Sequence, residues 1–189
     1  MEAFLVSTGI VALAEMGDKT QLLSLVLAAR FRRPIPIILG ILVATLLNHA
    51  CAGAVGAWIT AWVGPSAMRW ILGLSFIAMA VWVLIPDRLD DDVRPSGRYG
   101  VFGTTLLAFF FAEMGDKTQI ATVALAAQYA AFYAVVAGTT LGMMIANVPA
   151  VLLGERMTRK VPIRAIHGIA ALIFAVLGVA ALLGFGDVL

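Results

Sequence analysis

An eight-residue segment of this chain occurs twice without a single change. The sequence AEMGDKTQ occupies residues 14–21 and again residues 112–119, a displacement of 98 residues. The likeness extends beyond the segment, because residues 27–29 and Gly40 each meet the same residue type 98 positions later. Identity of this length at a fixed displacement indicates an internal repeat, so we expect two homologous halves.

The composition restricts what those halves can be. Hydrophobic residues make up 62% of the 189 residues and charged residues 13%, with a mean hydropathy of +1.00, whereas soluble domains are about half apolar and about a quarter charged. At about 20 residues per membrane span, the chain has room for about six spans and no separate soluble domain. Apolar runs bounded by Gly, Pro and Arg predict spans at 3–29, 35–62, 69–85, 101–128, 132–153 and 163–184. The predicted fold is an all-α membrane protein with six transmembrane helices.

The repeat divides these spans into two sets of three. Residues 1–85 form the first three-helix repeat, residues 86–100 a charged linker, and residues 101–189 the second repeat. Because three is odd, the second half is expected to enter the membrane in the opposite direction. This predicts two inverted repeats in one integrated domain, an arrangement typical of secondary transporters with a site near the midplane.

Basic residues predict the orientation. The loops after the first, third and fifth spans hold ten of them, namely Arg30, Arg32, Arg33, Arg88, Arg94, Arg98, Arg156, Arg159, Lys160 and Arg164. The opposite loops hold only Arg69. The positive-inside rule therefore places the linker in the cytoplasm and both termini outside it. The N-terminus lacks the basic start of a signal peptide, so the first helix should be retained, with the plasma (inner) membrane as the default location.

Two other classes of function are disfavoured. Redox chemistry is disfavoured, because the single cysteine, Cys51, cannot form an intramolecular disulfide or a CxxC site. The pI of about 9.0 is explained by basic residues beside spans, so no nucleic-acid partner is expected. The partners expected are the lipid bilayer and transported ions, and the sequence leaves open whether the chain forms a homodimer.

The repeated segment carries the chemistry. Glu15 and Asp18, like Glu113 and Asp116, fall near the middle of an expected span, and their i, i+3 spacing predicts one helix face for each pair. A charge at a helix centre in a bilayer costs about 2.5–3.5 kcal/mol, so these groups are expected to converge. Gly17 would allow two backbones to approach closely or a helix to loosen.

Four carboxylates suit a hard divalent cation, since oxygen ligands are those that Mg²⁺, Ca²⁺ and Mn²⁺ prefer. With Lys19 and Lys117 included, the group carries a net charge of −2, which one divalent cation or two protons would neutralise. Exchange of a metal ion for protons follows as a hypothesis, with the metal as substrate and no cofactor. We expect the two lysines to restrain the carboxylates.

Neighbouring polar residues have lesser expected roles. Thr20, Gln21, Thr118 and Gln119 could offer neutral oxygens or form interhelical hydrogen bonds, with neither role favoured. Asn48 and Asn147 are favoured as hydrogen-bonding residues over ligands. A proton-carrying role for His49 is the lesser alternative to the same structural role, and His167 is expected at the membrane interface.

Two copies of E-x-G-D-[KR]-[TS], each opening a three-helix half, closely resemble the membrane family that includes the Golgi manganese transporter and bacterial manganese exporters. Both motifs fit completely, at Glu15, Gly17, Asp18, Lys19 and Thr20 and at Glu113, Gly115, Asp116, Lys117 and Thr118. The resemblance covers nearly the whole chain. It implies transport of Mn²⁺, or Ca²⁺ in some members, by exchange with protons, with the acidic residues as ligands.

Three alternatives remain open on the sequence. The substrate could be Na⁺ or a small organic cation. The acids could serve an intramembrane aspartyl protease or lipid-pyrophosphate phosphatase, but the motif lacks the repeated Arg or Ser that a phosphatase would need, and no enzyme is predicted. Glu15 with Lys19, and Glu113 with Lys117, could also form purely structural i, i+4 ion pairs.

Overall fold

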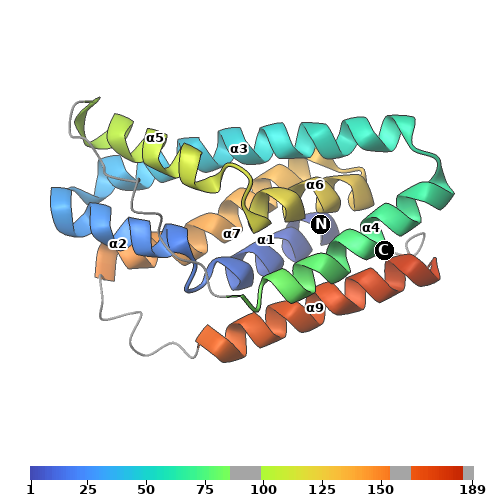
Figure 1. Ribbon diagram of the computed structural model, residues 1–189. Helices are drawn as coiled ribbons and strands as arrows, with labels where there is room; N and C mark the ends of the chain where they lie inside the picture. The colour runs from blue at the N-terminus through green and yellow to red at the C-terminus, as the bar shows by residue number, and fades with distance from the viewer. Residues whose placement is uncertain (86–98, 154–162, 185–189) are drawn as a thin grey trace.

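The structure is a computed structural model that describes residues 1–85, 99–153 and 163–184. Within these ranges the chain is helical and contains no strand. The helices are α1 (Glu2–Glu15), α2 (Lys19–Phe31), α3 (Pro34–Trp62), α4 (Pro65–Trp82), α5 (Gly100–Glu113), α6 (Lys117–Tyr129), α7 (Phe132–Leu153) and α9 (Ile163–Leu183), shown in Figure 1. The all-α prediction is thus confirmed for the described residues.

The sequence repeat is also a repeat of helix boundaries. Helices α1, α2, α3 and α4 begin 98 residues before α5, α6, α7 and α9 respectively. Each half begins with two short helices separated by the repeated motif and continues with two longer ones. Helix α3 starts with Pro34 in its first turn, a position that needs no backbone N–H donor.

Three described helices, α3, α7 and α9, are long and apolar enough to cross a membrane. Helix α4 is apolar but shorter, as is α5. Helices α1, α2, α5 and α6 have 13 or 14 residues each, which at 1.5 Å per residue gives about 20 Å. None of these four could cross a hydrocarbon core of about 30 Å alone.

The spans expected at 3–29 and 101–128 are therefore not continuous helices. Helix α1 ends at Glu15 and α2 begins at Lys19, and between them Gly17 has φ +85°. Gly115 repeats this geometry with φ +77°. A left-handed conformation ends an α-helix, and glycine adopts it without a steric penalty.

The break also corrects the expected geometry of the acids. Glu15 is the last residue of α1, whereas Asp18 is the N-cap of α2, where its Oδ1 accepts a hydrogen bond of 2.7 Å from the Lys19 backbone N–H. The i, i+3 prediction of one shared helix face is wrong because the helix does not continue through the motif. Asp116 likewise precedes α6 as its N-cap.

The two halves are packed crosswise. Helix α1 makes its most extensive contacts with α7 of the other half, and α5 packs mainly against α3. Helices α4 and α9 lie side by side along one flank of the molecule (Figure 1). The beginnings of α2 and α6 consequently meet near the centre of the structure, where the two motifs face one another.

Part of the predicted topology lies outside the described residues. Residues 86–98 of the expected linker and residues 154–162 are not described. Six of the ten basic residues that predict the orientation lie in these two ranges.

Replacing Gly17 with alanine should destabilise the protein for two reasons. A left-handed conformation costs an L-residue about 1–2 kcal/mol, and a β-carbon at Gly17 would lie 2.6 Å from Cγ2 of Ile163. Gly115→Ala has only the first cost, because no atom lies within 4 Å of that position. Thermal unfolding in detergent should rank Gly17→Ala below Gly115→Ala, and both below the helical control Gly9→Ala. Equal melting temperatures for the three variants would contradict the described break.

Candidate functional site

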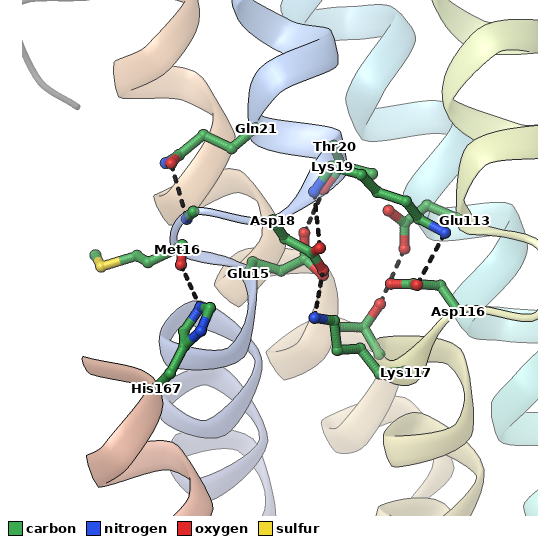
Figure 2. A network of polar contacts seen from close by, with 12 residues as sticks. Glu15, Met16, Asp18, Lys19, Thr20, Gln21, Glu113, Asp116, Lys117 and His167 are labelled. Carbon is green, nitrogen blue, oxygen red and sulfur yellow. Dashed lines mark hydrogen bonds and ion pairs between the residues drawn. The ribbon is translucent and has the colours of Figure 1, made fainter. Parts of the chain in front are cut away.

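The four motif carboxyl groups lie together at the two helix breaks. Glu15 and Glu113 are fully buried at the ends of α1 and α5, and Asp18 and Asp116 are 1% and 3% exposed before α2 and α6. Figure 2 shows the side chains of both motifs pointing toward one another across the interface between the halves. The structure thus brings into one place the residues that the sequence singled out.

Three of the carboxyls have the spacing of a cation site. Glu15, Glu113 and Asp116 each offer one carboxylate oxygen, and these oxygens all lie within 4.8 Å of one another. Two oxygens bound to one Ca²⁺ at 2.3–2.6 Å are at most about 5 Å apart. A single divalent ion could therefore contact all three groups with little rearrangement.

The same three residues hold unused hydrogen-bonding capacity. Oε1 of Glu15, Oε1 of Glu113 and Oδ2 of Asp116 are buried and have no hydrogen-bond partner. A buried polar atom without a partner costs roughly 1–3 kcal/mol. Three such oxygens in one cluster could accept a cation or protons.

The lysines pair across the repeat. Nζ of Lys19 lies 2.9 Å from Oδ1 of Asp116, and Nζ of Lys117 lies 3.4 Å from Oδ2 of Asp18 (Figure 2). Each motif's lysine thus pairs with the aspartate of the other motif. These crossed pairs join each lysine to an aspartate, a pairing that the structural alternative did not include, and they hold α2 and α6 together at their N-terminal ends.

The motif threonines orient the glutamates. Oγ1 of Thr20 donates a hydrogen bond of 2.5 Å to Oε2 of Glu15, and Oγ1 of Thr118 donates one of 2.9 Å to Oε2 of Glu113. Each bond joins the end of one short helix to the beginning of the next. Since it occupies one carboxylate oxygen, it leaves the other oxygen of each glutamate for a ligand.

The glutamines stabilise the breaks by hydrogen bonds to the backbone. Oε1 of Gln21 accepts a bond of 2.9 Å from the Gly17 N–H, and Oε1 of Gln119 accepts one of 2.8 Å from the Gly115 N–H. Nε2 of Gln21 also donates to the Ala146 carbonyl of α7 at 2.9 Å. The bond from Gln21 to Ala146 is interhelical, as one of the two roles left open for these residues requires, whereas the Gln119 bond stays within its own motif.

The polar residues of α3 and α7 hold helices to one another. Nδ2 of Asn48 donates to the Phe110 carbonyl at 3.1 Å, and Oδ1 of Asn147 accepts from Oγ of Ser24 at 2.8 Å. His49 is buried and neither ring nitrogen has a hydrogen-bond partner. The role of Ser24 escaped the sequence reasoning, although its position three residues after Gln21 places it on the same face of α2.

His167 makes a contact that the sequence did not indicate. It is 8% exposed, and its Nε2 lies 2.6 Å from the carbonyl oxygen of Met16 in the first helix break (Figure 2). The sequence predicted an interfacial position because basic residues precede it along the chain. Only the packing of α9 against α1 brings it to the motif.

Apolar helices enclosing a buried carboxylate cluster between two interrupted helices are typical of membrane transporters of cations. The sequence model of the family described as "Divalent cation/proton antiporter GDT1" matches residues 3–91 and 101–186. The chain belongs to this GDT1 family of divalent cation/proton antiporters.

Curated relatives agree with this assignment. A protein of Vibrio cholerae named "Putative manganese exporter" is 50% identical over 181 residues, which cover 95% of this chain and 90% of that protein. The "GDT1-like protein sll0615" of Synechocystis is 26% identical, covering 92% of this chain and 93% of its own. The "GDT1-like protein 5" of Arabidopsis thaliana is 23% identical, covering 97% and 96%. No solved structure matches the chain.

The two glutamines provide a matched test of the asymmetry between the halves. Gln21→Ala removes hydrogen bonds to both Gly17 and Ala146, whereas Gln119→Ala removes only the bond to Gly115. We expect the free energy of unfolding to fall by about 1–3 kcal/mol more for Gln21→Ala, because a buried backbone group loses its partner. Unfolding by denaturing detergent would measure the difference. A larger effect of Gln119→Ala would contradict the described contacts.

Proposed function

We propose that this protein exports Mn²⁺ from the cytoplasm in exchange for protons, through one site shared by Glu15, Asp18, Glu113 and Asp116. Membership of the divalent cation/proton antiporter family and the name of the Vibrio relative support the ion and the exchange. Ca²⁺, which has the same preference for oxygen ligands, is the second candidate ion.

The observation that carries the proposal is the set of three unpartnered oxygens on Glu15, Glu113 and Asp116. A purely structural cluster would pair its buried oxygens, because each unpaired one destabilises the fold. A transport site must instead leave them available for an ion that arrives and departs.

Charge balance connects the metal to the protons. The four ionised carboxyls and two ammonium groups sum to −2, so one divalent cation gives a neutral site. When the cation leaves, two protons on the unpartnered oxygens restore neutrality, whereas an empty and ionised site would leave uncompensated charge in a medium of low dielectric constant. Release of metal is thereby coupled to uptake of protons.

The pseudo-symmetry assigns a part to Asp18. The positions equivalent to Glu15, Glu113 and Asp116 after exchange of the halves are Glu113, Glu15 and Asp18. In a conformation with the roles of the halves exchanged, Asp18 replaces Asp116 as the third ligand. Lys117 and Lys19, each paired with an aspartate of the opposite motif, restrain these groups in the conformation described.

The membrane arrangement belongs to the same proposal. Helices α1 and α2 together form one interrupted span, as do α5 and α6, which with α3, α4, α7 and α9 gives six spans in two inverted repeats. Helix length supports this, since two short helices in line are long enough to cross and one is not. Residues 1–85 and 101–189 are the two repeats, the linker is cytoplasmic, and both termini lie outside the plasma (inner) membrane.

The proposal predicts metal flux that depends on both glutamates. Proteoliposomes with an acidic interior should take up Mn²⁺ as protons leave, and dissipating the pH gradient should abolish the uptake. Glu15→Gln and Glu113→Gln should each reduce the initial rate by at least about 100-fold, because each removes a ligand and a proton acceptor. Uptake is followed with a Mn²⁺-quenched dye inside the vesicles, and a parallel assay with Ca²⁺ defines the selectivity.

Glu2→Gln is the matched control, because Glu2 is an exposed glutamate in the first turn of the same helix as Glu15. It should transport at the rate of the unaltered protein. Wild-type flux in either motif variant, with the protein folded and inserted, would refute the shared site.

A further inference from the structure

The two helix breaks differ in how they are covered. Helix α9 lies over the first break, where a β-carbon at Gly17 would come within 2.6–3.2 Å of three atoms of Ile163 and where His167 meets the Met16 carbonyl. At the second break, Gly115 has no atom within 4 Å of the same position, and Met114 is 54% exposed. Identical motifs thus have opposite surroundings.

The repeat identifies the residues of α4 that are equivalent to those covering the first break. Subtracting 98 from His167 gives Arg69, and from Ile163 gives the first residue of α4. Helix α9 packs against α1, but α4 packs against α6 and not to a similar extent against α5. Arg69 is exposed and lines a cavity of about 580 Å³ together with Gln128 and Gly184.

The two motif lysines show the same asymmetry. The side chain of Lys19, which pairs with Asp116 beside the second break, is 21% exposed. The side chain of Lys117, which pairs with Asp18 beside the first break, is fully buried. The four carboxyl groups are themselves buried, but the residues around the second motif are more exposed than those around the first.

An uncovered break cannot face lipid. Non-helical backbone at membrane depth is tolerated only where it is buried in protein or lines a water-filled cavity. Residues 114–115 are not buried by the described chain, so in the arrangement proposed above they face water.

From this we infer that α4 and α9 are paired gates, with His167 holding α9 over the Met16 carbonyl in this conformation and Arg69 holding α4 over the Met114 carbonyl in the opposite one. The inference rests on the inverted-repeat arrangement of the proposed function. Helices α4 and α9 are packed together, so they move as one body, and closing one break opens the other. Arg69 and His167 are positioning residues, since both supply N–H donors to a backbone carbonyl and neither contacts the ion.

The test measures water accessibility and needs no transported ion. Single cysteines replace Met16 or Met114 in a background with Cys51→Ser, and a charged, water-soluble thiol reagent labels the protein in lipid nanodiscs without divalent cations. We expect Met114→Cys to react at least about tenfold faster than Met16→Cys. Adding His167→Leu should raise the Met16→Cys rate about fivefold to tenfold and lower the Met114→Cys rate, because loss of one hydrogen bond shifts a two-state equilibrium by about that factor.

Arg69→Leu should shift the two labelling rates in the reverse direction, and His167→Gln, which keeps an N–H donor, should restore the unaltered pattern. A merely structural role would raise both rates together in His167→Leu. That result, or protection of Met114→Cys in the otherwise unaltered protein by a second copy of the chain, would overturn the paired gates. Because thiol labelling does not depend on metal flux, the labelling results can reject the paired gates without rejecting the proposed antiport. The flux assay can likewise reject antiport without rejecting the gates.

Discussion

The fold depends on bringing six ionisable side chains together inside an apolar protein. Each charge alone would carry a desolvation cost, whereas the four carboxylates and two ammonium groups together leave a net charge of −2, which one divalent cation would cancel in the proposed function. The crossed pairs Lys19–Asp116 and Lys117–Asp18 make this possible only when the halves are in contact. The association of the halves and the existence of the site are thus one requirement.

The interruption of two helices follows from that requirement. A continuous helix would present only side chains to the carboxylate cluster, because its backbone N–H and C=O groups are hydrogen-bonded to one another. Ending α1 at Glu15 and starting α2 after Asp18 releases the ends of two helices toward the cluster, and the glutamine and threonine side chains satisfy the groups that the site does not use. Gly17 and Gly115 are the residues that permit the chain to turn there.

The sequence predicted the parts of this structure that repeat and the parts that are uniformly apolar. Helices α7 and α9 match the spans expected at 132–153 and 163–184 almost to the residue, because each is a long and predominantly apolar run. The sequence allowed a local loosening of the helix at Gly17, but it did not predict that each span ends and starts again there, since a single glycine is also compatible with a continuous helix. Nor could spacing reveal the lysine partners: a lysine four residues from a glutamate satisfies a helical rule, and only the crossing of the halves offers Lys19 a better partner in Asp116. The place of His167 depended on tertiary packing in the same way.

The crossed ion pairs also bear on how such a chain could have arisen. In either half alone, the lysine would lack its aspartate partner, which lies on the other half. Its ion pair would form only beside a second copy of that half. Two separate copies inserted in opposite directions would restore every crossed contact, because each half supplies what the other lacks. The ionic complementarity therefore suits an ancestor in which one short chain paired with itself before duplication joined the two copies, and the identical eight-residue segments are what such a fusion would preserve.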